Sequence, residues 1–203
     1  CTNPSLEHCQ RNTLAKCKVR KKGGSIFHCS SKASDILKKR VLVTGATGFV
    51  GRQIVRNLSR LGCDLVLVIR EGKQNTLNDL SITGSVVKTA DLFSEDEFWW
   101  AKQCHDVDTI VHAAWYAETG KYLQSSKNLK CLSGSLKLAQ GAVSAGVRRI
   151  IGVGTCFEYD LKDGELSVST PLKPISTYAA TKAALFMTWS QWLPAQSTEF
   201  AWC

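Results

Sequence analysis

The segment that most constrains this chain is a short apolar run followed at once by three glycines. Val41-Leu42-Val43 is typical of a buried strand, and residues 49–61 carry apolar side chains at helical spacing. Gly45 allows a tight turn off the strand, Gly48 lets the backbone approach a ligand, and Gly51 lets the helix pack against the sheet. Amides at the start of such a helix favour an anion. The alternative to an anion site is a purely structural turn. The predicted cradle for the pyrophosphate of a dinucleotide consists of Thr44, Gly45, Thr47, Gly48, Phe49, Val50 and Gly51.

The rest of the chain after residue 40 alternates apolar runs with segments of helical spacing. The run 65–69 is apolar throughout, which is typical of a strand covered on both faces. Strands that alternate with helices form a parallel sheet between two helix layers, so the predicted fold class is α/β with a doubly wound parallel sheet. Ser94, with Glu97 three residues later, predicts the capped start of a short helix. We expect strands at 41–43, 65–69, 86–90, 107–113, 147–153 and 198–203, and helices at 49–61, 122–145 and 175–193, the last stopped by Pro194.

Positive charge is concentrated at the N-terminal end. Residues 1–40 contain ten Lys or Arg and two acidic residues, a net charge of +8, whereas the remaining 163 residues carry +1. We predict that residues 1–38 form a basic, cysteine-containing, disordered extension and that residues 39–203 form the folded domain. A transit peptide, or an arm that binds nucleic acid or an anionic membrane, is the alternative. The segment has no nucleic-acid-binding signature, so we expect no nucleic-acid partner.

Membrane and metal-binding proteins are disfavoured. No stretch approaches 18 consecutive apolar residues, so no membrane span is expected. The nine cysteines include no C-x-x-C pair and match no standard zinc spacing, so no metal site is expected. Their odd number gives no disulfide framework, and no secretory apolar segment is present. We therefore expect reduced thiols in a cytoplasmic protein.

The residue that contacts the adenosine ribose should end the second strand, about 20 residues after the glycines. That position holds Arg70, where a carboxylate would indicate NAD. A guanidinium suits the 2′-phosphate of NADP, so NADP is the preferred cofactor and NAD the alternative. The alternative is that Arg70 is an ordinary surface arginine, and Glu71, which follows it, keeps the question open. Asp91 ends the third strand and is either an acceptor for the adenine amino group or a turn aspartate.

Tyr178 and Lys182 lie four residues apart on the predicted helix 175–193, so their side chains share one face. A tyrosine has a pKa of about 10, which must fall by roughly three units for acid or base catalysis at neutral pH. A lysine one turn away and an oxidised nicotinamide supply positive charge that lowers it. Thr155 ends the fifth strand, and its hydroxyl can polarise the same carbonyl. These three residues are the predicted catalytic set; two exposed helix residues are the alternative for the Tyr/Lys pair.

Together these motifs resemble the extended short-chain dehydrogenase/reductase family, and within it the NAD-dependent epimerase/dehydratase group, over residues 40–203. The resemblance implies an NAD(P)-binding Rossmann fold in which Leu92, Ala113 and Ala114 lie near the cofactor. It also implies that Lys182 holds the nicotinamide ribose and that hydride moves to or from the nicotinamide. The matching segments are the glycine turn, Asp91-Leu92, His112-Ala113-Ala114, Thr155 and the Tyr178/Lys182 pair.

Departures from the family pattern narrow the resemblance. Dehydratases of this group carry an Asp-Glu pair directly after the catalytic Thr, whereas this chain has Cys156-Phe157, which disfavours a dehydratase. The family usually carries an asparagine on the long helix. In this chain that residue is either Asn128, or Cys131 stands in its place. The segment 112–123 looks closest to reductases and epimerases that act on 4-keto nucleotide sugars. Trp115 within it borders the sugar or simply packs in the core.

The resemblance implies an NAD(P)-dependent oxidoreductase or epimerase that acts on a nucleotide sugar at a 4-keto or 4-hydroxy group, with Tyr178 as acid or base. The alternative is a non-catalytic NAD(P)-binding or redox-sensing module. The family's nucleotide-sugar-binding region follows the sixth strand, where this chain ends, so we expect a truncated chain that binds dinucleotide weakly and turns over little. The resemblance also implies a homodimer of the complete protein through the helices at 122–145 and 175–193.

Overall fold

The structure is a computed structural model that describes residues 39–78, 82–162, 164–167 and 169–203. The hypotheses about the basic segment 1–38 lie outside the described residues. The predicted division of the chain into an extension and a folded domain therefore stays a prediction. No helix in the described part of the chain combines the length and the hydropathy needed to cross a bilayer.

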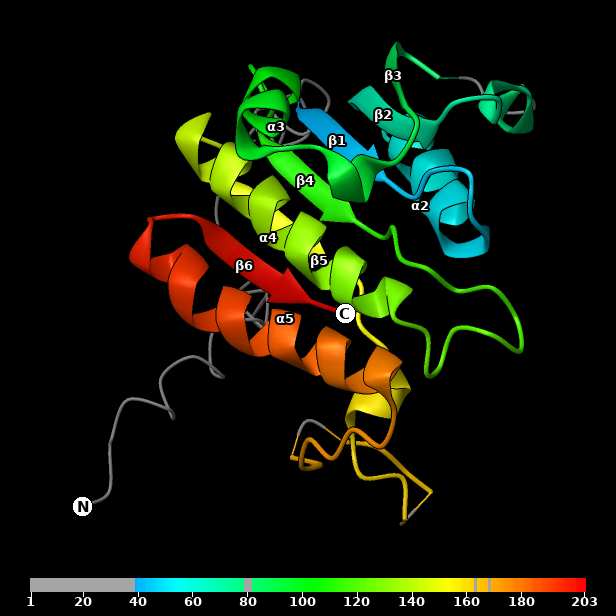
Figure 1. Cartoon of the computed structure of the whole chain (residues 1–203). Helices are drawn as coiled ribbons and strands as arrows, with labels where there is room; N and C mark the ends of the chain where they lie inside the picture. The colour runs from blue at the N-terminus through cyan, green and yellow to red at the C-terminus, as the bar shows by residue number, and fades with distance from the viewer. Residues whose placement is uncertain (1–38, 79–81, 163, 168) are drawn as a thin grey trace, which may run out of the picture. The chain divides into compact units, whose positions relative to one another are not determined.

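A single six-stranded sheet forms the centre of the described residues, and all of its strand pairs are parallel. The strand order β3-β2-β1-β4-β5-β6 reverses direction at β1, so the chain winds outward from the middle twice (Figure 1). This order confirms the predicted doubly wound parallel sheet. The strands are β1 Arg40–Thr44, β2 Asp64–Arg70, β3 Gly84–Thr89, β4 Thr109–His112, β5 Arg149–Gly152 and β6 Glu199–Trp202.

Helices cover both faces of this sheet. One core cluster joins the sheet to α3, α4 and α5, and a second joins the other face to α2. In β2 the side chains alternate between the two clusters, with Leu67 facing α2 and Val66 facing α3 and α4. Each fully buried aliphatic side chain stabilises the fold by about 1.5–3 kcal/mol. The helices are α2 Phe49–Arg60, α3 Glu97–Gln103, α4 Lys127–Ser144 and α5 Thr177–Ala195, with short 3-10 turns η2 Gln74–Leu77, η3 Leu92–Ser94 and η4 Cys156–Glu158.

Several predicted helix boundaries are wrong, and one of them is the start of α5, which lies at Thr177 and not at residue 175. The cap of α3 is Asp96, whose Oδ1 accepts a hydrogen bond from the Trp99 amide at 2.7 Å; the predicted cap, Ser94, lies in η3. The helix α4 begins at Lys127 rather than at residue 122. The preceding residues form turns, because the side chain of Asn128 donates hydrogen bonds to two of their carbonyl groups. The helix α5 continues through Pro194 to residue 195, since a proline in the last turn leaves only one carbonyl without its helical donor.

Candidate functional site

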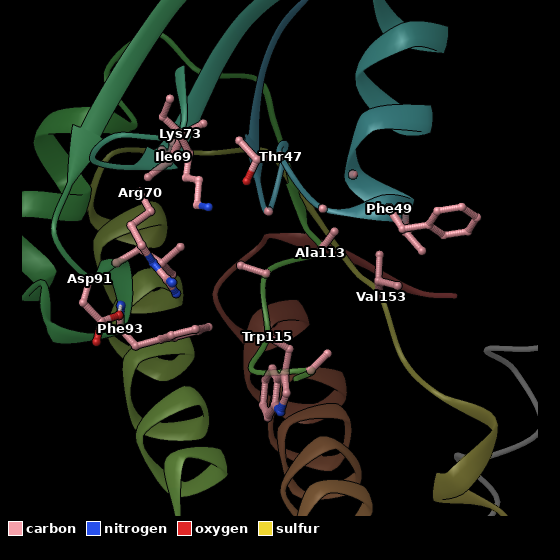
Figure 2. Close-up of a pocket in the computed structure, with 18 of the residues that line it drawn as sticks. Thr47, Phe49, Ile69, Arg70, Lys73, Asp91, Phe93, Ala113, Trp115 and Val153 are labelled. Carbon is pink, nitrogen blue, oxygen red and sulfur yellow. Dashed lines mark hydrogen bonds between the residues drawn. The ribbon is translucent and has the colours of Figure 1, made fainter. Parts of the chain in front are cut away.

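A cavity of about 420 Å³ opens at the carboxyl ends of the central strands, beside the point where the strand order reverses (Figure 2). Ligands of open α/β sheets bind at this position. Thirteen of the fifteen predicted site residues line the cavity; Thr44 and Thr155 do not. The thirteen are Gly45, Thr47, Gly48, Phe49, Val50, Gly51, Arg70, Asp91, Leu92, Ala113, Ala114, Tyr178 and Lys182.

The glycine turn is held by close contacts between main chains. Gly45 has φ +73°, and a Cβ atom there would lie 2.7 Å from the Ala114 amide nitrogen. A Cβ atom at Gly51 would overlap the carbonyl of Gly45. Both positions therefore require glycine for sterics within the protein, which brings the start of α2 close to the edge of the sheet.

The start of α2 carries unpaired amides toward the cavity. The first hydrogen bond within the helix runs from the Arg52 amide to the Gly48 carbonyl at 3.0 Å, so the amides of residues 49–51 precede it. No side chain in the described part of the chain caps this end, and its first turn holds no acidic residue. Three free amides and the positive end of the helix dipole fit a pyrophosphate.

Two cationic side chains line the cavity where β2 ends. Arg70 is the last residue of β2, and Lys73 follows it across a turn in which Gly72 has φ +76°. Both side chains line the cavity, and Figure 2 shows them extending toward the same space. Glu71 is not among the lining residues. Sequence reasoning missed Lys73, although a second cation three residues after Arg70 was the available signal.

Asp91 lies at the cavity wall, but other groups already hold its carboxylate. Its Oδ1 accepts a hydrogen bond from the Phe93 amide at 3.1 Å, and its Oδ2 is 2.7 Å from the Lys130 ammonium. Partial burial alone would raise the pKa of Asp91, but the hydrogen bonds from Lys130 and Phe93 outweigh it, so the pKa is lowered. Asp91 is therefore a fixed, ionised acceptor.

Thr44 lies behind the cavity wall, in a buried hydrogen-bonded chain. Its Oγ1 is 2.8 Å from His112 Nδ1, and His112 Nε2 is 2.8 Å from Ser135 Oγ. Because the Ser135 hydroxyl donates to the Cys131 carbonyl at 2.7 Å, we assign the proton of His112 to Nε2. Thr44 then donates to Nδ1 and accepts from the Ala114 amide at 3.3 Å. Thr44 thus positions the Ala113-Ala114 segment from behind.

Tyr178 lies at the opposite end of the cavity from the second-strand cations, beside Thr155. Burial raises the pKa of Tyr178, a hydrogen bond with Thr155 opposes this rise, and the nearby Tyr122 and Glu158 add to it. The Tyr122 ring meets the Tyr178 ring edge-on, with 4.8 Å between centroids. The lowering of the tyrosine pKa that we expected is therefore not produced by the protein alone, and Tyr178 is a protonated phenol at neutral pH.

Lys182 is almost completely buried and bonds to the main chain instead of to Tyr178. Its Nζ donates to the Val153 carbonyl at 2.5 Å and lies 4.2 Å from the centre of the Trp115 ring. Burial lowers the pKa of Lys182 to about 8, and the charge of Glu158 opposes that lowering. Trp115 therefore packs beneath the lysine while also lining the cavity.

The two candidates for the helix asparagine have different surroundings. Asn128 donates to the carbonyls of Tyr122 and Ser125, at 2.6 and 2.9 Å, and accepts from Trp115 Nε1 at 2.9 Å. Its amide thus holds the turn before α4. Cys131 is buried, and burial raises the pKa of its thiol to about 11, so it is protonated. Within the described ranges no group of three His, Cys, Asp or Glu residues could hold a metal ion.

Comparisons with known proteins agree with this geometry. A model described as the NAD dependent epimerase/dehydratase family matches residues 41–200. The chain is 21% identical over 142 residues to dTDP-6-deoxy-L-talose 4-dehydrogenase (NAD(+)) of Aggregatibacter actinomycetemcomitans, covering 70% of this chain and 51% of that protein. It is 27% identical over 166 residues to UDP-glucose 4-epimerase of Lactobacillus helveticus, covering 74% and 47%.

Among solved structures, UDP-N-acetylglucosamine 4-epimerase from Methanobrevibacter ruminantium M1 shares the fold, with a TM-score of 0.70 and 24% identity over 81% of this chain and 54% of that one. The chain spans about half the length of the curated relatives it matches. The family model begins at the strand before the glycine turn and continues into the last strand, so it includes the whole cavity wall. The chain therefore belongs to the NAD dependent epimerase/dehydratase family.

Proposed function

We propose that this chain forms the cofactor-binding part of an NAD(P)-dependent oxidoreductase or epimerase that acts on a nucleotide sugar at a 4-keto or 4-hydroxy group. One observation carries the proposal: a single cavity joins the free amides of the glycine turn to Tyr178 and Lys182. The relatives named as a 4-dehydrogenase and 4-epimerases support position 4 of the sugar.

NADP is the proposed cofactor, with NAD as the alternative. The amides at the start of α2 would hold the pyrophosphate, and Arg70 with Lys73 would hold the 2′-phosphate. Asp91 would accept from the adenine amino group with its remaining lone pairs, since a carboxylate accepts about four hydrogen bonds. When bound, this coenzyme supplies or accepts a hydride.

The proposed chemistry of the chain's own residues is proton transfer at the substrate oxygen. Tyr178 is a phenol in the protein alone, so it is ready to donate a proton to a carbonyl oxygen during reduction. Thr155 would hold the same oxygen by a hydrogen bond, because its side chain lies next to that of Tyr178. For oxidation of an alcohol Tyr178 must act as a base, which requires additional positive charge near its ring.

Titration of NADPH fluorescence with the 203-residue chain tests the cofactor site. We expect saturable binding that NADP competes away. The absence of binding at millimolar NADPH would overturn the proposal. A matched variant, Gly51→Ala, would fill the space between the turn and α2 and should not bind.

Turnover separates catalysis from binding alone. In the full-length protein we expect Tyr178→Phe to keep NADPH affinity within about threefold and to lower the rate of 4-keto sugar reduction by about 10²–10⁴. Equal rates for the Tyr and Phe forms would remove the catalytic role. Binding without reduction by the unaltered full-length protein would favour the non-catalytic module.

The homodimer stays a prediction. The outer surface of α4 and α5 exposes Leu129, Met187 and, just before α5, Ile175. Leu129 and Ile175 line the same surface hollow, and exposed apolar side chains that lie together support a contact with a second copy. Sedimentation of the full-length protein and of its Leu129→Lys form should show a dimer only for the former.

A further inference from the structure

Glu158 is a carboxylate enclosed in the protein near Tyr178 and Lys182. It is the only acidic side chain among the described residues that is fully buried. Its Oε1 accepts a hydrogen bond from the Thr155 amide at 2.8 Å, and its Oε2 accepts from Trp202 Nε1 at 3.1 Å. Both partners are donors, which is the arrangement that an ionised carboxylate requires.

The groups around Lys182 give Glu158 its significance. Cys131 faces the ammonium from α4 as a protonated thiol, and His112 faces it from β4 as a neutral imidazole, because burial lowers the pKa of His112 to about 3. Tyr178, on the same helix, is a neutral phenol. Burial raises the pKa of Glu158, and the hydrogen bonds from Thr155 and Trp202 and the charge of Lys182 oppose that rise. Among the described titratable groups that face Lys182, Glu158 is the one carboxylic acid, and the indole that it holds lies 5.7 Å from Lys182 Nζ.

We propose that Glu158 is a positioning residue for the reaction proposed above, on which this inference rests: its carboxylate fixes the main chain of Thr155 and supplies the buried negative charge that keeps the Lys182 ammonium ionised beside Tyr178. Glu158 acts through these neighbours, and it is not among the residues that line the cavity. The energetic basis is that a buried ammonium whose hydrogen-bond acceptor is a neutral carbonyl loses its hydration without a full counter-charge.

The last strand completes this arrangement. Trp202 of β6 places its indole over Gly152 and Gly154, where a Cβ atom would overlap the ring. The indole holds Glu158 Oε2, and its ring centre lies 5.7 Å from Lys182 Nζ. The two glycines at the end of β5 therefore make room for a side chain that orients the carboxylate.

The test removes the charge of Glu158 and keeps an acceptor for the Thr155 amide. In Glu158→Gln alone, one of the two N–H donors would face the amide nitrogen. In the double variant Glu158→Gln/Trp202→Phe, the Gln oxygen can serve the Thr155 amide, and no indole donor remains. The single variant Trp202→Phe is the matched control, because it loses the same indole and keeps the charge.

The readout is the titration of Lys182 in the 203-residue chain, followed by NMR of ¹³Cε-labelled lysine and assigned with Lys182→Met. We expect the pKa of Lys182 to be lower by about one unit or more in the double variant than in Trp202→Phe. Equal values in the two folded variants would overturn the proposal, because a merely structural glutamate would not move this titration.

Two further measurements keep the outcomes distinct. In the unaltered chain, the ¹³C shift of the Glu158 carboxyl should report an ionised group at pH 7, and a protonated one would overturn the proposal even if the double variant fails to fold. NADPH titration of the unaltered chain tests the proposed function separately. If NADPH does not bind and the Lys182 titration still shifts, the positioning of the charge stands and the function fails.

Discussion

The two ends of the cavity are built in different ways. At the glycine end, main-chain atoms shape the site, and the essential feature at Gly45 and Gly51 is the absence of a side chain. At the end that holds Tyr178, buried side chains shape the site, with Lys182 resting on a carbonyl and an indole and Glu158 enclosed below.

This difference teaches where each kind of function is sensitive. A main-chain anion site carries no titratable group of its own, so it depends on sterics and little on pH. The buried polar end depends on charge states that burial shifts, as in Lys182 and His112. We therefore expect the glycine end to be disrupted by added side-chain atoms. The end that holds Tyr178 and Lys182 should be disrupted by changes in protonation or charge.

Added atoms at the glycine end should have the largest effect. Gly51→Ala should lower the free energy of unfolding by about 3 kcal/mol or more, because its Cβ would overlap main-chain atoms that cannot move independently. The control Gly72→Ala has φ +76° but open space, so about 1–2 kcal/mol is expected. Urea denaturation measures both. Equal losses would show that conformational strain, and not close packing, limits this end.

Protonation of His112 should lower the stability of the folded chain. The pKa of His112 is about 3 in the folded protein, below the usual 6.5 that applies when it is unfolded. The unfolded chain thus binds the proton more tightly, and stability falls as the pH drops below 6.5. Between pH 7 and pH 5 the expected loss is about 2 kcal/mol. Urea denaturation of the unaltered chain and of His112→Gln should show a flatter pH dependence for the variant, and parallel curves would contradict the assignment.

Loss of Arg70 or Lys73, the cations at and just after the end of β2, should change cofactor choice without changing the fold. Arg70→Ala and Lys73→Ala should each weaken NADPH binding about tenfold, equivalent to about 1.4 kcal/mol, because each would remove a charged donor that we propose for the 2′-phosphate. NADH affinity should stay within about twofold. Parallel titrations with the two coenzymes decide this. An equal loss of affinity for NADPH and NADH would mean that these residues attract any anionic coenzyme and do not select the 2′-phosphate.

The smallest effect is expected at the surface ion pair between Lys130 and Asp91, the proposed acceptor for the adenine amino group. Lys130→Ala removes the partner of Asp91, and both side chains are partly exposed, so the loss of stability should be under about 1 kcal/mol. NADPH affinity should fall by about two- to threefold as the carboxylate loses one restraint. Denaturation and fluorescence titration on the same sample test this, and a tenfold loss of affinity would mean that Lys130 contacts the cofactor itself.

Helix boundaries mark where local patterns stop being informative. Ser94 and Asp96 are both good caps, and their choice depends on Asp96 being extended while Ser94 lies in a 3-10 turn. The start of α4 depends on the side chain of Asn128, which reaches backward to hold the preceding turns. The start of each of these helices is therefore set by contacts of single side chains, which a pattern of apolar spacing does not reveal.

The sequence by itself determined the alternating strands and helices, the glycine turn and the spacing of Tyr178 from Lys182, because each of these is written in residues close together along the chain. Only the tertiary structure brought Lys73 to the cavity, set Thr44 behind its wall and enclosed Glu158 between Thr155 and Trp202. The physical reason is that burial and charge pairing arise between residues far apart in the chain: Trp202 meets Glu158 across 44 positions, and no local pattern carries that contact.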